Sequence, residues 1–383
     1  MNRFESYFGI IIALFFGVFI ATFFGDQISL PAPIVATYTA SSTLSVESDS
    51  SSPAPSPSLV LPKESIVATS SAEATSTPHK KITTSAPVAV AAVVPKSTSV
   101  PSPAPVSAAE LDASAALLRA ALVNILCYVP QGTILHSISG SGVFIDPKGI
   151  ILTNAHIAQY FLLADRDVTC VIRSGSPARN NYSAALMYIP PAWIKENANV
   201  LTEETPSGTG QYDFALLAVT KSATSSALPA AFPSLPLAQQ PPVPGTPIVI
   251  ASYGAQFLES SQIQSSLFPT VVFGSVKDVF TYVKNTIDVI ALGGSAAAQE
   301  GSSGGGVAGA SGTLLGTITT STIKGDTSTR SLSAITASYI RGEYASETGE
   351  AIDILLAAST SASVANFAPR IPSLEKILAS QLP

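Results

Sequence analysis

The stretch "GSGVFIDPKGIILTNAHIAQYF", residues 140–161, decides how the rest of the chain is interpreted. A β-type run in it ends in Thr-Asn-Ala-His, and a short helix-like segment follows. His156 therefore stands at the end of a strand. Of the two other histidines, His79 lies in a polar tract and His136 in a polar loop, where solvation is the simplest explanation. A lone histidine is more often structural, so His156 needs partners before it indicates catalysis.

Two candidate partners follow His156 along the chain. Asp213 lies in "QYDFALLAV", at the start of an apolar run, where a carboxylate can be buried and accept a hydrogen bond from an imidazole N–H. Ser303 lies in "GSSGGGV", residues 301–307. Taken singly, the aspartate is typical of a turn cap and the glycine run is typical of a flexible turn. Taken together, His, Asp and Ser follow the chain order of chymotrypsin-type serine proteases.

One rival interpretation concerns the same serine. Residues 301–305 also fit Gly-x-Ser-x-Gly, the nucleophile elbow of α/β-hydrolases. In that fold the catalytic histidine follows the serine, but no histidine follows His156 in this chain. The chain also lacks the alternation of strands and helices that an α/β fold needs. A subtilisin-type arrangement, in which an aspartate precedes the histidine, also needs an α/β fold and is excluded for the same lack of alternation.

Three stretches, "GSGVFIDPKGIILTNAH", "DFALL" and "GSSGG", resemble the signature stretches of trypsin-like serine proteases, and most closely those of the HtrA/Deg-like branch. The resemblance covers about residues 115–345. It implies an all-β fold of two six-stranded antiparallel β-barrels with the active site between them. Barrel one, about 115–232, would supply His156 and Asp213, and barrel two, about 245–345, would supply Ser303. Too few residues follow barrel two for the PDZ domain that HtrA-type enzymes usually carry.

The same resemblance implies the role of each site residue. Ser303 would be the nucleophile, His156 the general base, and Asp213 the group that orients the imidazole. The backbone N–H groups of Gly301 and Ser303 would form the oxyanion hole. Two positions depart from the pattern, because Ser302 stands where the family has Asn or Asp and Gly306 replaces a proline.

The expected walls of the substrate pocket are small and uncharged. They are formed by Ala297, Ala298, Thr319 and Ser321. No acidic residue among them awaits a Lys or Arg side chain. The sequence therefore predicts a small or medium apolar residue on the acyl side of the cleaved bond.

The β-rich fold is also predicted without the resemblance. Short β-type runs such as "FALLAV" and "PIVIASY" are separated by Gly, Pro, Asn and Ser, which is typical of a barrel or sandwich. "SETGEAIDILLAAS" predicts a C-terminal helix that Ser346 could cap. Cys127 and Cys170 are the only cysteines. They form one disulfide in an oxidising compartment or stay as two buried thiols, and both alternatives are open.

The N-terminal third of the chain has a different composition. Residues 6–25 are mostly apolar and uncharged, long enough to span a bilayer as a helix. We expect a signal anchor over 1–27, a disordered Ser/Thr/Pro/Ala-rich linker over 28–107, a protease domain over 108–360 and a C-terminal tail over 361–383. The end of that tail, "PRIPSLEKILASQLP", is either a short amphipathic helix on the barrel or a segment that binds a partner. Arg3 before the apolar run predicts a cytoplasmic N-terminus and an extracytoplasmic protease domain, periplasmic or on the cell surface. A cleaved signal peptide is the competing interpretation, and both export the remainder.

The composition narrows the class of function. The net charge is −6, only 11% of the residues are charged and no basic block stands out, so we expect no nucleic-acid partner. No cofactor or metal is expected. The leading hypothesis is a membrane-tethered serine endopeptidase acting on exposed or unfolded polypeptide, with an oligomer left open. The alternatives are a catalytically inactive pseudoprotease that serves as a binding or scaffold module, and a surface structural protein that works through its tether.

Overall fold

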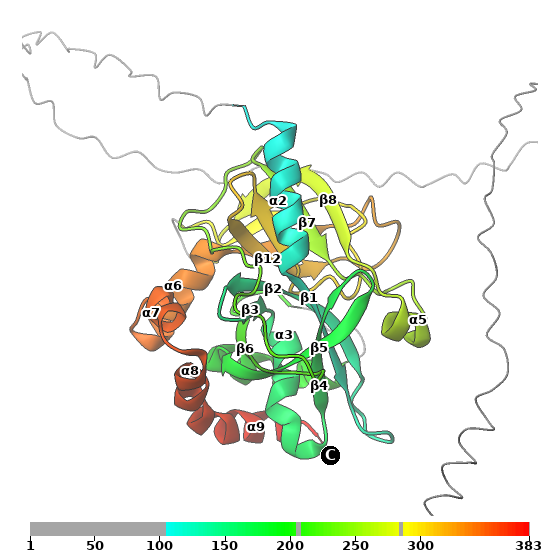
Figure 1. Ribbon diagram of the computed structural model, residues 1–383, viewed down its shortest axis with the longest axis vertical. Helices are drawn as coiled ribbons and strands as arrows, with labels where there is room; N and C mark the ends of the chain where they lie inside the picture. The colour runs from blue at the N-terminus through cyan, green and yellow to red at the C-terminus, as the bar shows by residue number, and fades with distance from the viewer. Residues whose placement is uncertain (1–104, 204–207, 283–285, 383) are drawn as a thin grey trace, which may run out of the picture. The chain divides into compact units, whose positions relative to one another are not determined.

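The computed structural model describes residues 105–203, 208–282 and 286–382 (Figure 1). The predicted anchor and nearly all of the predicted linker therefore lie outside the described residues. Within the described ranges, no helix combines the length and the apolar character needed to cross a membrane.

The described chain begins with a capped helix. Helix α2, Ala108–Ala121, starts at Ser107, whose hydroxyl accepts a hydrogen bond from the Glu110 N–H while the Glu110 carboxylate accepts one from the Ser107 N–H. This reciprocal pair satisfies two N–H groups that a helix start leaves free. Leu118 and Ala121 of the helix are buried, and its contacts run to strands of both β units. The chain changes directly from helix to strand at Leu122.

The first β unit is a closed six-stranded barrel in which all neighbouring strands are antiparallel. The strand order is β1-β2-β3-β6-β5-β4, and the barrel closes where β1 pairs with β4. In that pair Cys127 lies opposite Cys170, and a disulfide joins the two side chains. The strands are β1 Leu122–Tyr128, β2 Ile138–Asp146, β3 Ile150–Thr153, β4 Thr169–Gly175, β5 Ala178–Tyr188 and β6 Ala215–Ser222.

Short helices connect the strands of this barrel. Helix α3, Ala155–Ala158, and the 3₁₀ helix Gln159–Arg166 follow β3, and helix α4, Pro191–Asn197, and the 3₁₀ helix Ala198–Thr202 follow β5. His156 thus lies on the first helical turn after a buried strand, as the sequence predicts.

The second β unit has seven strands, where the sequence predicted six. Its order is β8-β7-β11-β12-β13-β10-β9, and again every pair is antiparallel. The strands are β7 Pro247–Ser252, β8 Thr270–Ser275, β9 Asp278–Phe280, β10 Val289–Ala291, β11 Gly306–Gly309, β12 Leu314–Ser321 and β13 Leu332–Thr336, with helix α5, Ser260–Ser265, between β7 and β8.

The seventh strand arises from a change of partner within one extended run. The Val276 N–H donates to the Thr246 carbonyl at 3.0 Å, on the β7 side of the sheet. The next N–H, that of Lys277, donates to the Ala291 carbonyl at 2.8 Å, in β10. The two ends of the sheet, β8 and β9, are therefore successive parts of one run. This run brings the sheet ends together, and counted once it leaves the six predicted strands.

The C-terminal region holds several helices where the sequence predicted one helix and a tail. The helices after β13, within the described residues, are α6 Ala337–Thr348, α7 Ile352–Ala357, α8 Thr360–Phe367, the 3₁₀ helix Ala368–Arg370 and α9 Ile371–Ala379. Ser346 is not a cap, because it lies inside α6, which begins after Thr336 and ends at Gly349 with φ +77°. A glycine in this left-handed conformation stops a helix without steric cost.

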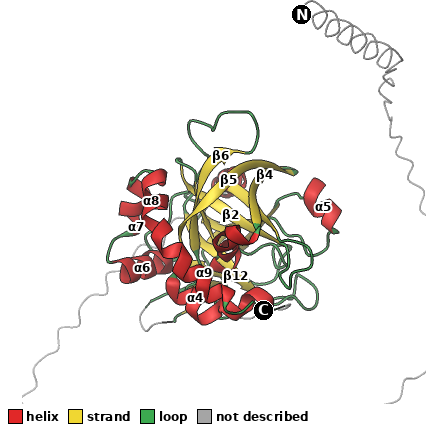
Figure 2. Cartoon of the chain, turned by 90° about the horizontal axis from the view of Figure 1, so that it is seen from below, coloured by secondary structure: helices red, strands yellow, loops and turns green. Residues whose placement is uncertain are grey.

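The predicted tail packs on the first barrel. Helix α8 contacts β5 and β6, and α9 contacts the short helices of the same barrel. Phe367, Leu374 and Leu378 are buried there. In Figures 1 and 2 helices α6 to α9 cover one side and one end of the strands.

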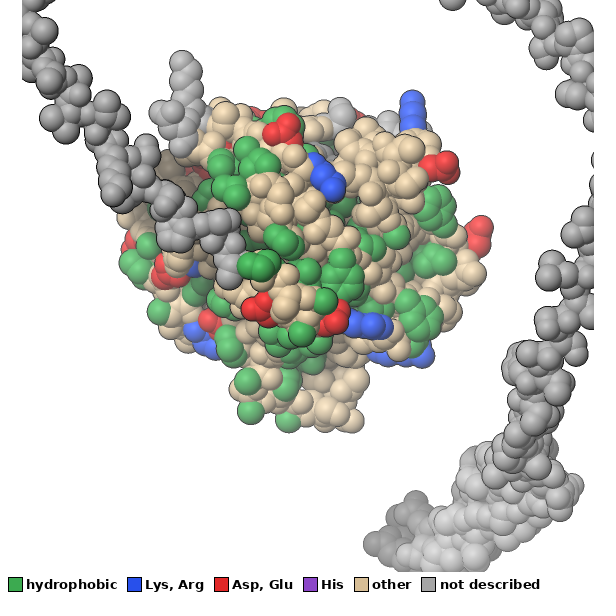
Figure 3. All heavy atoms as spheres, turned by 90° about the horizontal axis from the view of Figure 1, so that it is seen from above, with side chains coloured by type: hydrophobic (Ala, Val, Ile, Leu, Met, Phe, Trp, Pro, Cys, Tyr) green, Lys and Arg blue, Asp and Glu red, His purple; other side chains and the backbone are tan. Residues whose placement is uncertain are grey.

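The face drawn in Figure 3 carries isolated charged side chains scattered among uncharged ones.

Candidate active site

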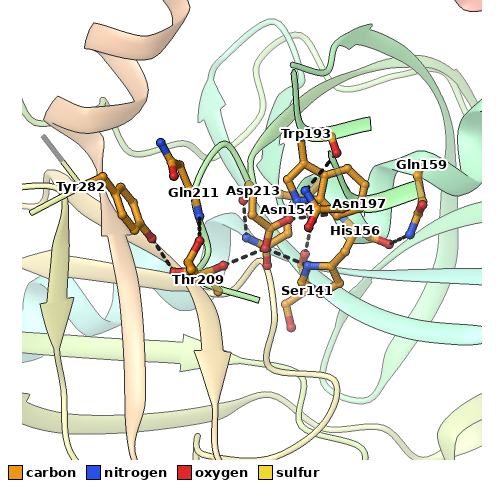
Figure 4. Close-up of polar contacts among 12 residues, drawn as sticks. Ser141, Asn154, His156, Gln159, Trp193, Asn197, Thr209, Gln211, Asp213 and Tyr282 are labelled. Atoms are coloured by element: carbon orange, nitrogen blue, oxygen red, sulfur yellow. Dashed lines mark hydrogen bonds and ion pairs between the residues drawn. The ribbon is translucent and has the colours of Figure 1, made fainter. Parts of the chain in front are cut away.

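His156 and Asp213 meet at two points. The imidazole Nδ1 lies 2.8 Å from Asp213 Oδ2, and the His156 backbone N–H donates to Asp213 Oδ1 at 3.0 Å (Figure 4). An ionised carboxylate only accepts hydrogen bonds, so Nδ1 carries the proton and Nε2 of the neutral ring keeps its lone pair. The His156 side chain is 23% exposed and that of Asp213 is 7% exposed. The pair therefore presents a partly exposed base on a buried carboxylate.

The Asp213 carboxylate also receives a donor from the other barrel. The Thr319 hydroxyl, from β12, donates to Asp213 Oδ2 at 2.7 Å. On the first barrel, Asn154 Nδ2 donates to the Asp213 carbonyl at 2.8 Å. These donors supply the partners that a buried carboxylate and its peptide require. The sequence placed Thr319 only in the wall of the substrate pocket and gave Asn154 no separate role.

The backbone before Asp213 is held in an uncommon conformation. Tyr212 has φ +59°, in the left-handed region that residues other than glycine, asparagine and aspartate rarely adopt. Its N–H donates to the hydroxyl of Tyr339 in α6 at 3.0 Å. Such strain persists only where surrounding contacts fix it, and it is found most often at functional sites. Helix α6 thus supports the turn that carries Asp213.

Close approach of neighbouring backbone explains two of the glycines around Ser303. Gly304 has φ +83°, and a Cβ atom there would overlap the Ser141 carbonyl oxygen of β2. Gly301 has φ +89°, and a Cβ there would lie 2.7 Å from the Tyr253 carbonyl oxygen. The loop is therefore fixed by its surroundings, and the run "GSSGGGV" is more than a flexible turn.

The peptide groups around Ser303 leave two N–H groups free. The Glu300 carbonyl accepts from the Ala255 N–H at 2.8 Å, and the Ser302 carbonyl accepts from the Gly305 N–H at 2.9 Å. In a trans peptide the N–H points away from the C=O, so the N–H groups of Gly301 and Ser303 are directed opposite to these bonds. Neither N–H donates to any acceptor among the described residues. Two free N–H groups separated by one residue can stabilise an oxyanion.

Comparison with protein-family models identifies the kind of domain that contains these residues. Residues 140–316 match the family model of the trypsin-like peptidase domain. The chain contains a trypsin-like serine peptidase domain. The match includes the positions of His156, Asp213 and Ser303. No curated protein matches the chain.

Similar solved structures include two forms of the Rv3671c protease from M. tuberculosis. The active form is 19% identical with a TM-score of 0.41, and the alignment covers 64% of this chain and 92% of that one. The inactive form is 18% identical with a TM-score of 0.40, and the alignment covers 63% and 96%.

The structure shows which residues surround Ser302 and Gly306, the two positions that depart from the trypsin-like pattern. Ser302 is 1% exposed, and its hydroxyl accepts a hydrogen bond from the Ser252 hydroxyl at 3.0 Å. A short neutral pair thus occupies the position of the Asn or Asp expected from the resemblance. Gly306 begins β11, and a Cβ there would lie 2.7 Å from Leu118 of α2. Packing of α2 against the start of β11 therefore leaves little room for a side chain at this position.

The residues predicted to form the walls of the substrate pocket have different positions in the peptidase domain. Ala297 and Ala298 are fully buried, and Ser321 lies in β12 opposite Leu332. The Ala298 carbonyl accepts from Nη1 of Arg330 at 2.8 Å. Arg330 is 5% exposed, and the sequence gave it no role.

In the described part of the chain, no group of three or more His, Cys, Asp or Glu side chains is arranged to hold a metal ion.

Proposed function

We propose that this serine peptidase is an endopeptidase that works through His156, Asp213 and Ser303. The observation that carries the proposal is the contact of 2.8 Å between His156 Nδ1 and the buried Asp213 carboxylate. It leaves Nε2 as the basic nitrogen and provides a negative charge that stabilises the imidazolium. The free N–H groups of Gly301 and Ser303 add the second element, a site for developing negative charge.

The proposed reaction uses only groups of this chain and water. Ser303 Oγ attacks the carbonyl carbon of the peptide bond as His156 Nε2 takes its proton, and a tetrahedral oxyanion forms. The N–H groups of Gly301 and Ser303 bind that oxyanion. His156 then gives the proton to the leaving amine, and an acyl-enzyme remains. Water, activated by His156, hydrolyses the ester and returns Ser303 to its initial state.

The sequence and the predicted pocket residues also support a substrate class and a cellular location for the enzyme. The small side chains of Ala297 and Ala298 support a small or medium apolar residue on the acyl side of the cleaved bond, in an exposed or unfolded polypeptide. The apolar run 6–25 supports a single N-terminal anchor, and Arg3 supports an extracytoplasmic peptidase domain. We also place the peptidase in the HtrA/Deg-like branch, because the stretch "GSGVFIDPKGIILTNAH" resembles the signature of that branch.

One observation favours the second candidate, an inactive binding module. No hydrogen bond joins Ser303 Oγ to His156 in the part of the chain that the structure describes. In unliganded enzymes such bonds are often long and tighten only when substrate binds. The complete set of His156, Asp213 and Ser303 therefore keeps the peptidase as the leading candidate.

Cleavage of casein by the full-length chain tests the proposal. We expect the parent protein to cleave casein and the Ser303→Ala and His156→Ala variants to lose about 10³-fold or more in rate. A folded parent that cleaves no faster than Ser303→Ala would support the binding module instead.

A further inference from the structure

Ser141 lies in β2 of the first barrel but contacts the loop of the second barrel that carries Ser303. Its side chain is fully buried. Its backbone N–H donates to the Ser303 carbonyl at 2.7 Å, and its hydroxyl donates to the Gly301 carbonyl at 2.8 Å. One residue therefore contacts the carbonyls of both residues whose N–H groups are proposed to bind the oxyanion (Figure 4 labels Ser141).

The orientation of the Ser141 hydroxyl is fixed by a second hydrogen bond. The Tyr253 N–H donates to Ser141 Oγ at 2.8 Å. A hydroxyl has a single proton to donate, and an N–H partner can only use its lone pairs. The proton is therefore committed to the Gly301 carbonyl. The Ser141 carbonyl is held in turn by the Thr153 hydroxyl at 2.7 Å, so the whole residue is immobilised.

Ser141 completes a series of four fixed peptide groups. The carbonyls of Glu300 and Ser302 are held by N–H groups of the second barrel, from Ala255 and Gly305. The carbonyls of Gly301 and Ser303, which alternate with them, are held by Ser141. Each peptide is planar, so fixing four successive carbonyls leaves little freedom to the N–H groups between them. Gly301 is the weak point, because a glycine can rotate where other residues cannot.

We propose that Ser141 is a positioning residue that keeps the N–H groups of Gly301 and Ser303 aligned on the oxyanion. The inference rests on the proposed endopeptidase function and adds a part that comes from the opposite barrel. Without the Ser141 hydroxyl, the Gly301 carbonyl loses its donor, and only the bond of 3.2 Å from the Ser302 N–H to the Gln299 carbonyl opposes rotation of the Gly301–Ser302 peptide. The oxyanion site is then misaligned while His156 and Asp213 keep their contact.

The matched control is another buried serine that reaches the second barrel. Ser114 of α2 is 1% exposed, and its hydroxyl donates to the Gly309 carbonyl of β11 at 2.7 Å. Ser141→Ala and Ser114→Ala each remove a buried hydroxyl that donates to a second-barrel carbonyl. Only the first removes a hydroxyl that contacts the proposed oxyanion loop.

The test compares the full-length parent, Ser141→Ala, Ser141→Cys and Ser114→Ala in the hydrolysis of 4-nitrophenyl acetate and in labelling by a fluorescent fluorophosphonate. We expect Ser141→Ala to lower kcat about 10- to 100-fold with KM within about twofold, and to slow labelling in the same proportion. The acidic limb of the kcat/KM profile should stay where it is in the parent, because the His156–Asp213 pair is untouched. Ser141→Cys, which keeps a weak donor, should recover part of the rate, and Ser114→Ala should keep kcat within about twofold.

Two results would overturn the inference. One is a kcat of Ser141→Ala within about twofold of the parent, and the other is an equal loss in Ser114→Ala, which would indicate general destabilisation. A parent that neither turns over nor labels contradicts the proposed function instead. Amide hydrogen exchange then decides the inference separately, because Ser141→Ala must speed exchange in residues 299–305 more than Ser114→Ala does.

Discussion

At the scale of single residues, Asp213 depends on donors from two barrels. The His156 contacts come from the first barrel, and the Thr319 hydroxyl comes from the second at 2.7 Å. The Thr319 bond matters because it fixes one carboxylate oxygen that also faces the imidazole. A buried carboxylate that loses a donor reorients or takes up a proton more readily.

Replacing Thr319 by valine removes that donor and keeps the shape of the side chain. We predict that Thr319→Val lowers kcat about tenfold while KM stays within about twofold, because the orienting carboxylate loses a partner. Thr220→Val is the control, since the Thr220 hydroxyl donates to the Ser183 carbonyl at the far end of β6. Steady-state kinetics of the two variants should differ, and equal values would contradict the role of Thr319.

Gly304 provides a second prediction at this scale. Its φ of +83° and the Ser141 carbonyl next to it both oppose a side chain. Gly349 has φ +77°, but nothing lies within 4 Å of the position of its Cβ. Gly349→Ala therefore carries the backbone strain alone, at about 1–2 kcal/mol, and Gly304→Ala adds the overlap with backbone.

We predict that Gly304→Ala lowers the free energy of unfolding by at least about 2 kcal/mol more than Gly349→Ala and abolishes activity. Urea unfolding of both variants checks this difference. Equal unfolding free energies would mean that the loop can move away from Ser141, and that the barrels do not fix it.

The sequence proposes the residues of the candidate site but does not give all of their contacts. His156, Asp213 and Ser303 are predictable because the stretches around them carry a known order and composition. The hydroxyls of Ser141 and Thr319 act across the two barrels, and no local pattern shows which distant peptide a strand serine or threonine will face. The Ser in "GSG", residues 140–142, was the one available signal for Ser141.

At the scale of elements, local patterns predicted most strands but not every boundary. The split of Thr270–Phe280 into β8 and β9 depends on which neighbouring strand supplies the next hydrogen bond, at Thr246 or at Ala291. A helix was predicted in the C-terminal region, but its start was placed at Ser346, after most of α6. A helix that begins directly after a strand, at Ala337, has no loop composition to mark it.

Helix α6 also makes a pH-dependent contribution. Burial raises the pKa of the Glu343 carboxyl above its ordinary 4.5, and the negative charges of Asp288 and Glu347 add to the shift. The folded protein therefore binds this proton more tightly than the unfolded chain does. The stability that Glu343 contributes is present at low pH and is lost as the pH rises through its folded-state pKa.

We predict that Glu343→Gln raises the melting temperature relative to the parent at about pH 7 and loses this advantage at about pH 4. Glu110→Gln is a control of opposite sign, because hydrogen bonds from Ser107 lower the pKa of Glu110. That variant should melt below the parent at about pH 7. Differential scanning calorimetry at both pH values checks the pair, and a gain for Glu343→Gln that does not change with pH would contradict the account.

At the scale of the described domain, the candidate site depends on how the two barrels meet. Ser141 binds the loop of Ser303, and Thr319 binds the carboxylate of the other barrel. The disulfide between Cys127 and Cys170 joins β1 to β4, and neither of these strands takes part in the two contacts. We therefore expect it to affect the stability of the domain more than its activity.

Removing the disulfide separates these two properties. The bridge joins cysteines 43 residues apart, and a loop of this size stabilises by about 4 kcal/mol in the chain-entropy model. We predict that the Cys127→Ala, Cys170→Ala double variant loses about that much unfolding free energy and keeps kcat within about twofold. Urea unfolding of the parent with and without reductant is the matched check, and an unchanged midpoint would contradict a stabilising bridge.

Ser303 is tested most directly as the nucleophile by the mass of the full-length protein after treatment with a fluorophosphonate, followed by peptide mapping of the adduct. We predict one adduct on the parent, at Ser303, and at most about a hundredth of that labelling rate in His156→Ala, which lacks the base. An adduct at another serine, or a folded parent that takes up none, would contradict the assignment of His156, Asp213 and Ser303 as the working site.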